Sequence, residues 1–217
     1  MKRVFLLPLI MGLVLCSCVV SANAQSDRKY NKEMEKVYKK KTKELKKEGW
    51  KVTGVSLTLE AAIMKHFRAV NSDAKNKELT TNVSMCKSLN VCSVQALNNA
   101  LVRYAENAGS YVRGRVVSDL FNNASGEVPE EFDKFYAAYE RLVSAEIKGE
   151  VQFSVAFEKN NGDGRAYQAW FIVNEDKAAQ ARVRAMQRAF EETKLAQRYA
   201  NQVADFVRTG FQVEGDR

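Results

Sequence analysis

The chain has 217 residues, and its hydrophobic fraction of 46% and aromatic fraction of 10% exclude an intrinsically disordered protein. The formal net charge is +8, which would suggest nucleic acid as a partner in a cytosolic protein. About 190 residues follow the first 24, enough for one globular domain with its own core.

The start of the chain carries the three parts of a secretory signal peptide. A Lys-Arg pair is followed by an apolar run over residues 4–20 and then by a Ser-Ala-Asn-Ala sequence that ends at Ala24. The run is too short, and too close to this small-residue site, to favour a retained membrane span. We therefore expect cleavage between Ala24 and Gln25, with residues 1–24 as the signal peptide. The mature protein, without a membrane span, is expected to be exported, periplasmic or outer-membrane-associated.

A second interpretation of the same segment is lipidation. The sequence Leu-Cys-Ser-Cys at residues 15–18 is a degenerate form of a lipoprotein processing box, in which Cys18 would receive an acyl anchor. The alternative is that Cys16 and Cys18 are ordinary small residues of a signal peptide that is cleaved after Ala24.

The positive charge of the mature chain is concentrated in one arm. Residues 27–51 hold eleven basic and five acidic side chains, whereas the charges of the chain beyond them sum to zero. Residues 31–48 contain no Gly or Pro and favour a helix with a thin apolar stripe, which Gly49 would end. We expect a basic helical arm over residues 25–49 and a single domain over residues 50–217.

Two interpretations of this arm are open. Export argues against nucleic acid as the partner, and anionic lipid or polysaccharide of the envelope becomes the class of ligand that a lysine-rich surface would bind. The alternative is a solvated helix without a partner. The candidate anionic-surface residues are Lys36, Lys39, Lys40, Lys41, Lys43, Lys46 and Lys47.

Periodicity predicts the elements that follow the arm. Residues 50–57 alternate as in a strand, and Thr58 is placed to cap a short helix whose apolar stripe includes His66. The polar stretch over residues 71–81 indicates a loop. Residues 82–92 indicate a short strand or hairpin.

The middle of the chain is predicted to contain two helices and a strand. Ser93 is placed to cap the first helix, which Gly109 closes. Residues 112–120 alternate with the period of a strand. Pro129 opens the second helix, whose first turn is acidic as the helix dipole favours, and Gly149 ends it.

The clearest prediction is a β-hairpin. Residues 151–157 and 167–173 alternate between apolar and polar side chains, and Asn-Asn-Gly-Asp-Gly at residues 160–164 turns the chain. Asn174 caps a final helix that runs to about residue 207, with a largely alanine buried side. The expected fold is α+β, a mostly antiparallel sheet of three to five strands with helices packed on one face and a long C-terminal helix.

Two cysteines remain after signal cleavage, Cys86 and Cys92. Export places them where disulfides form and persist, so we expect a bond between them. A straight strand would hold their α-carbons too far apart, so residues 87–91 must turn back. The alternative is two free thiols in the core.

The sequence predicts no catalytic residue, metal ligand or cofactor. A single histidine, His66, rules out a site with two histidine ligands, and its place on an apolar stripe favours the edge of the core. Residues 160–164 have the residue types of a calcium loop but lack the distal glutamate. Trp170 and Tyr111 would mark a binding surface if an outer sheet face exposed them.

Several stretches resemble uncharacterised exported envelope proteins of Bacteroides-type bacteria. The stretches are NNA at 98–100, YAENAGS at 104–110, VRGRV at 112–116, FDKFYAAYER at 132–141 and FIVNED at 171–176. The order of elements is more distantly similar to small outer-membrane lipoproteins and to the N-terminal domain of flagellar assembly protein T. The resemblance implies an envelope protein with no catalytic residues to carry over.

We therefore expect a non-catalytic binding or structural module of the cell envelope, whose partner is an envelope protein or polysaccharide. The rivals are an envelope hydrolase with an unrecognised active site and an anionic-surface binder acting through residues 27–51. A deep pocket with converging acids or His66 would favour the hydrolase, and a flat sheet face with exposed aromatic residues would favour binding. The sequence does not predict the oligomeric state.

Overall fold

The computed structural model describes three stretches of the chain, which are residues 33–121, 130–193 and 199–209. The chain divides into two compact units, Met1–Glu48 and Gly49–Arg217.

The described part of the first unit is a helix over residues 33–47, in the middle of the predicted basic arm. Within it, the Thr42 hydroxyl donates a hydrogen bond to the Tyr38 carbonyl oxygen at 2.7 Å. The expected cleavage site after Ala24 and the candidate lipidation site at Cys18 lie outside the described residues.

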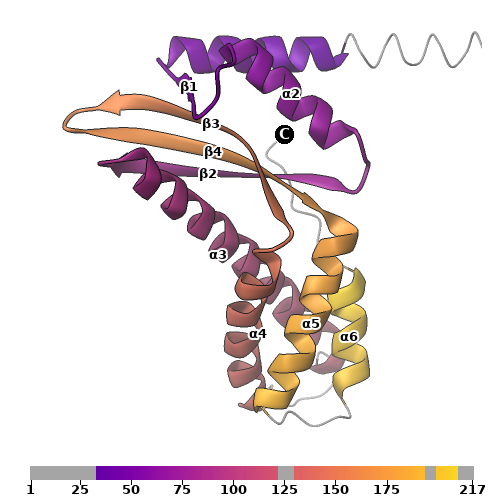
Figure 1. The fold of residues 1–217 in the computed structure, drawn as a ribbon. Helices are drawn as coiled ribbons and strands as arrows, with labels where there is room; N and C mark the ends of the chain where they lie inside the picture. Colours follow the sequence, from indigo (N-terminus) through magenta and orange to yellow (C-terminus); the bar gives the residue numbers. More distant parts are fainter. Residues whose placement is uncertain (1–32, 122–129, 194–198, 210–217) are drawn as a thin grey trace, which may run out of the picture. The chain divides into compact units, whose positions relative to one another are not determined.

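The second unit contains a four-stranded antiparallel sheet with the strand order β1-β3-β4-β2 (Figure 1). The strands are β1 (Lys51–Thr53), β2 (Asn76–Cys86), β3 (Val151–Asn161) and β4 (Gly164–Asn174). The predicted hairpin is confirmed as β3 and β4, and Gly162 in its turn has a φ of 59°, which glycine adopts without strain. The sheet and its helices confirm the predicted α+β class.

Helices lie on both faces of this sheet rather than on one. Trp170 points to one face, where its ring packs 4.9 Å from the ring of His66 on α2 (Leu59–Asn71). The next residue, Phe171, is buried on the opposite face, since successive strand side chains alternate. That face is covered by α3 (Leu89–Arg115). β4 therefore buries large apolar side chains on both of its faces, and each face has a helix as its cover.

The structure corrects the predicted loop over residues 71–81, because β2 begins at Asn76. Leu79, Thr81 and Val83 are buried at alternate positions, and the Thr81 hydroxyl donates to the carbonyl oxygen of Ala96 on α3 at 3.0 Å. Polar residues occupy the intervening positions, as in a strand with one buried face. The low apolar content of this strand explains why it resembles a loop.

The structure also corrects both ends of the helix predicted from Ser93 to Gly109. Ser88 is the N-cap of α3, and its hydroxyl accepts a hydrogen bond from the Val91 amide. At the other end α3 continues to Arg115, so the strand predicted over residues 112–120 is wrong. A π-helical segment, η1 (Val116–Phe121), follows.

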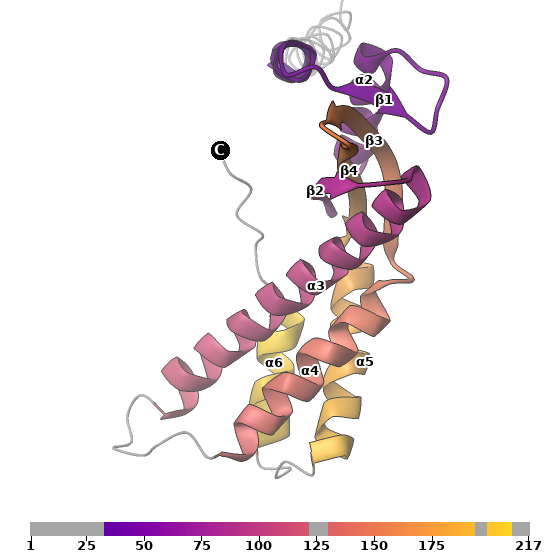
Figure 2. The same ribbon diagram turned by 90° about the vertical axis from the view of Figure 1, so that its left-hand side faces the viewer.

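The second half of α3 packs in a helical bundle with three further helices (Figure 2). They are α4 (Glu131–Ile147), α5 (Glu175–Thr193) and α6 (Ala200–Thr209). The helix predicted from Asn174 to about residue 207 is thus divided into α5 and α6, which lie side by side. The alanines of α5 confirm its predicted buried side and lie within the bundle: Ala178, Ala181, Ala185 and Ala189 are fully buried.

A buried arginine ties three helices of the bundle together. Arg182 on α5 is 1% exposed, and its guanidinium donates to the Tyr104 hydroxyl on α3 and to the Glu175 carboxylate at 2.6 Å. Its Nε–H donates to the carbonyl oxygen of Val207 on α6 at 3.4 Å. Burial raises the pKa of Tyr104 to about 12, so this hydroxyl is neutral at physiological pH.

Candidate functional site

The predicted anionic-surface residues lie on one side of the helix over residues 33–47. At 3.6 residues per turn, six of the seven lysines fall within an arc of about 120°, and no acidic residue lies inside that arc. We call these six residues the lysine face; its members are Lys36, Lys39, Lys40, Lys43, Lys46 and Lys47, all exposed.

The remaining sides of this helix differ in character. Leu45 is 4% exposed, and Met34 and Tyr38 are half-buried on the same side, opposite the lysine face. Lys41, the seventh predicted lysine, is half-buried at the border of that side. Lys39 forms a 2.5 Å ion pair with Glu35, and both side chains are about half exposed, so the pair contributes little stability. The pair also lowers the pKa of Glu35, mainly through the hydrogen bond from Lys39.

The predicted disulfide between Cys86 and Cys92 is confirmed, with 5.5 Å between the two α-carbons. It joins the last residue of β2 to the first turn of α3, so the turn that the bond requires is supplied by Ser88 and the start of a helix. The residues between the cysteines do not form the expected strand or hairpin. Cys92 is fully buried, and the bond fixes the beginning of α3 to the sheet.

His66 is fully buried and joins α2 to two strands. One ring nitrogen, Nε2, lies 2.6 Å from a carboxylate oxygen of Glu78 on β2, and Nδ1 lies 2.8 Å from the Ser154 hydroxyl on β3. If Nε2–H donates to Glu78, Nδ1 accepts the hydroxyl proton of Ser154, and both ring nitrogens are satisfied. The histidine lies deeper in the core than the predicted core edge.

This hydrogen-bond chain has the connectivity of a serine nucleophile, a base and an orienting carboxylate. Ser154 is the extra residue of a β-bulge between Phe153 and Val155, an irregularity that re-aims a side chain. Sequence reasoning missed this constellation, because Glu78 and Ser154 lie 12 and 88 residues from His66 in the chain and the three form no local motif.

The aromatic residues that could have marked an exposed sheet face do not do so. Trp170 is 1% exposed, covered by α2 residues and by Phe157, whose ring lies 4.8 Å away. Tyr111 is half-buried on α3, not on a strand. The exposed aromatic residue on the described sheet is Phe153, which is 53% exposed.

A polar groove runs between α3 and α4. Its lining residues include Glu106, Asn107, Arg113 and Ser118 on the side of α3 and η1, and Glu140 on α4. Burial raises the pKa of the Glu140 carboxyl, although the nearby guanidinium of Arg113 opposes the shift. The groove thus offers both donors and acceptors, which suits a small polar ligand rather than an apolar one.

Gly109 sets the depth at which Glu140 can lie in this groove. A Cβ atom at Gly109 would overlap the Glu140 side chain, so only glycine allows the carboxylate to approach the backbone of α3. Gly114, which also lines the groove, has open space where a Cβ atom would stand. Sequence reasoning assigned Gly109 to the end of a helix and so missed this close approach.

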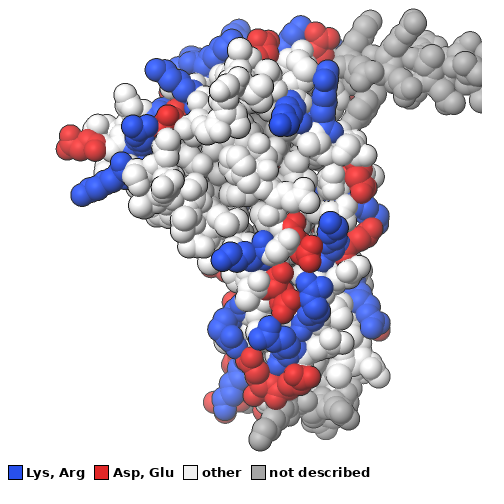
Figure 3. All heavy atoms as spheres, in the orientation of Figure 1, with Lys and Arg blue, Asp and Glu red and all other residues white. Residues whose placement is uncertain are grey.

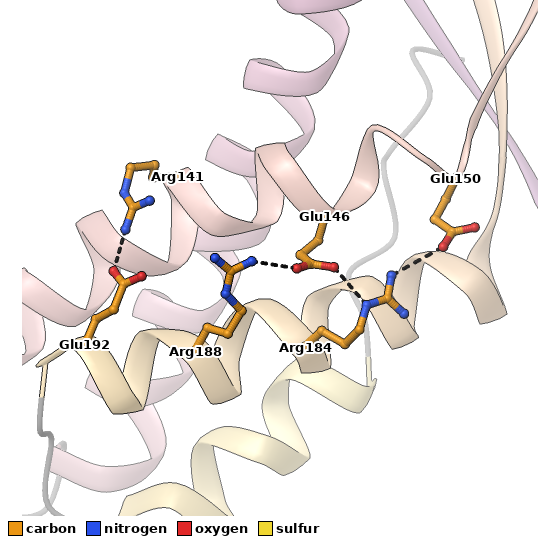
Figure 4. A network of polar contacts seen from close by, with 6 residues as sticks. All are labelled: Arg141, Glu146, Glu150, Arg184, Arg188 and Glu192. Atoms are coloured by element: carbon orange, nitrogen blue, oxygen red, sulfur yellow. Dashed lines mark hydrogen bonds and ion pairs between the residues drawn. The ribbon is translucent and has the colours of Figure 1, made fainter.

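An ion-pair network covers the surface between α4 and α5 (Figure 4). Glu146 accepts hydrogen bonds from Arg184 at 2.8 Å and from Arg188 at 2.9 Å, and these bonds lower its pKa. Arg184 also reaches Glu150 at 3.3 Å. A further pair, Arg141 with Glu192, lies at the far end of α5. The network satisfies its own charges and leaves no unmatched sign at its centre.

Within the described stretches, no group of three or more histidine, cysteine or acidic side chains is placed to hold a metal ion. Among the same residues, no helix has the length and apolar character needed to cross a membrane.

Comparison with known proteins found no match: no protein-family model, curated protein or solved structure matches this chain significantly. The resemblance to exported envelope proteins of Bacteroides-type bacteria therefore stays a prediction.

Proposed function

We propose that this protein is an exported, non-catalytic binding module of the cell envelope, and that the lysine face holds it against an anionic surface. The observation that carries the proposal is the segregation of six exposed lysines onto one side of the helix over residues 33–47. A helix that is merely solvated would need no such segregation, because its acidic residues could intersperse with the lysines.

The chemistry of the lysine face suits an extended array of phosphate or carboxylate groups. All seven basic residues of this helix are lysines and none is arginine. Lysine acts as a point charge on a flexible stem, whereas arginine recognises single anions by bidentate geometry. The helix is about 22 Å long and its lysines point along one side, so it can lie flat on such an array.

The strength of this contact should depend on ionic strength. Each lysine close to an anionic membrane surface contributes about 1 kcal/mol. The contributions are screened over a Debye length of about 8 Å at physiological salt. Six lysines therefore suffice for reversible attachment that is lost as salt is raised.

Cosedimentation with vesicles tests this proposal. We expect binding to vesicles that contain anionic lipid, weaker binding in high salt, and none to purely zwitterionic vesicles. A parallel series with an anionic envelope polysaccharide distinguishes the two sources of charge. The quadruple variant K36Q/K40Q/K43Q/K47Q should lose most of the binding.

The matched control removes the same number of charges from the second unit, in the variant K65Q/K77Q/K87Q/K148Q, all at exposed lysines. Equal loss of binding in both variants would show that net charge matters and the lysine face does not. Absence of binding by the unmodified protein to every anionic surface would overturn the proposal.

Export has its own test. Intact mass of the protein purified from its native envelope should give a chain that begins at Gln25. A diacylated chain that begins at Cys18 would contradict cleavage after Ala24 and would place the protein on a membrane by a lipid anchor.

The chain of hydrogen bonds through His66 favours a second candidate function, hydrolysis of an ester or amide by Ser154. We place it second because the imidazole is fully buried against Trp170 and serves equally to join α2 to the sheet. Labelling by a fluorophosphonate that is lost in Ser154→Ala, but retained in Ser84→Ala on another strand of the sheet, would establish this candidate. Unlabelled protein would remove it.

A further inference from the structure

The N-terminal half of α3 exposes a surface without charge. Residues 88–102 contain no Asp, Glu, Lys, Arg or His, although 28% of the chain is charged. Figure 3 shows a largely uncharged surface over the sheet and this part of α3, whereas the helical bundle is densely covered by charges of both signs. An exposed helix of this length without a charged residue is a feature of interfaces, whose centres are depleted of charge.

The outward side of this segment is partly apolar. Val91, Val94 and Val102 are 56%, 59% and 49% exposed. Together with Gln95 and Asn98 they recur at helical spacing and form one stripe, which we call the neutral face. Single exposed valines are ordinary, but three on one uncharged stripe leave apolar area that a partner would cover.

The opposite side of the same segment is held rigidly. Cys92, Ala96 and Ala100 are buried, and the disulfide to Cys86 and the hydrogen bond from Thr81 to Ala96 tie this segment to β2. The neutral face is therefore presented by a rigid element and would not have to be ordered when a partner binds, which lowers the entropic cost of association.

The neutral face restricts the chemistry of its partner. A charged side chain placed on it would be buried without a counter-charge, which is costly. Its partner must therefore be another uncharged surface with apolar side chains and amide groups. A second copy of the neutral face has these properties, and two-fold pairs are the commonest protein assemblies.

We propose that the neutral face is the interface of a homodimer in which two α3 helices pair in antiparallel orientation. With the two-fold axis between Ala96 and Leu97, Val91 faces Val102 of the second copy, and Gln95 faces Asn98 of the second copy. Each amide can both donate and accept, so the polar pair at the centre is self-complementary. This proposal is independent of the anionic-surface contact.

The dimer should be weak. One helix face of about four turns covers less than the roughly 800 Å² per partner of a standard interface. We therefore expect a dissociation constant in the micromolar range and exchange between monomer and dimer.

Sedimentation equilibrium of the purified protein, from about 1 to about 200 µM, measures this association in the range expected for a small interface. The unmodified protein should shift from monomer to dimer. Val94→Glu should raise the dissociation constant at least about tenfold, because the dimer would bury the new carboxylate between the two α3 helices. Val55→Glu, at another exposed valine outside α3, is the matched control and should dimerise normally.

Pairing geometry has a separate test. Mild oxidation of a mixture of Gln95→Cys and Asn98→Cys should give crosslinked pairs of the two variants. Crosslinking of each variant only with itself would overturn the antiparallel arrangement. A protein that stays monomeric at the highest concentration would overturn the homodimer, even if a photocrosslinker at residue 94 then captured another envelope protein.

Discussion

In the bundle, the surface between α4 and α5 is closed by ion pairs between Arg184, Arg188 and Glu146, whereas the surface of α3 beside the sheet bears no charge at all. Both regions share one continuous buried core, so the difference between them lies in the side chains that they expose. The ion-pair network between α4 and α5 pairs its own charges. The neutral face exposes apolar area, which a partner would bury.

The largest expected effect on folding stability comes from removal of a buried charge in the bundle. Arg182→Ala leaves Glu175 and Tyr104 without their buried donor, and we expect a loss of about 3–5 kcal/mol of folding free energy. Arg184→Ala, in the exposed network of the same helix, should cost only about 0–1 kcal/mol. Urea unfolding of both variants measures the difference, and equal losses would show that the burial of Arg182 does not matter.

The second-largest expected effect on stability comes from removal of the disulfide, which lies beside the neutral face. Replacing Cys86 and Cys92 by alanine should cost about 2 kcal/mol on the loop-entropy model. The loss should be accompanied by faster amide exchange at the start of α3 and by weaker dimerisation. Thiol titration of the denatured, unreduced protein should find neither thiol reactive. Two reactive thiols would show that the bond does not form.

Acid should weaken the ion-pair network but should not weaken dimerisation through the uncharged neutral face. The pKa of Glu146 is lowered by Arg184 and Arg188, so its contribution is present above the unfolded-state pKa and is lost as pH falls through the folded-state value. Glu146→Gln should cost about 1 kcal/mol or less at pH 7, because its partners are about half exposed. The difference from the unmodified protein should vanish at low pH. A constant difference across pH would rule out the ion pairs as its cause.

The smallest expected effect on stability comes from replacement of two glycines in α3. Gly114→Ala should stabilise the helix by about 0.5–1 kcal/mol, because its Cβ atom meets nothing. Gly109→Ala gains the same helix propensity but must displace Glu140, so its net effect should be smaller or reversed. Thermal melting of the two variants tests this order, and equal stabilisation would show that Glu140 moves without cost.

Local patterns in the sequence predict part of this fold. The hairpin of β3 and β4 was predictable because alternation and a glycine turn agree. Thr58 was predictable as a cap because it directly precedes an apolar stripe at helical spacing, and its hydroxyl accepts the Ala61 amide in the structure. Val112 and Val116, four residues apart, satisfy both a strand and a helix period. Helix packing decides between the two, so the strand predicted there was wrong.

The candidate sites were predictable to different degrees. The lysines could be named from composition, but their separation from the acidic residues appears only when the chain is wound as a helix. The pairing of Cys86 with Cys92 was predictable from the expected export, and the required turn within residues 87–91 is the start of α3. The contacts of His66 and Arg182 bring together distant residues, and no local pattern announces them.

The most direct test of the proposed function is hydrogen–deuterium exchange with and without anionic vesicles, at a protein concentration below dimerisation. We predict that vesicles slow exchange in residues 33–47 and leave residues 88–102 unchanged. Protection confined to residues 88–102 would contradict the proposed function. Absence of protection in the helix that carries the lysine face would contradict it as well.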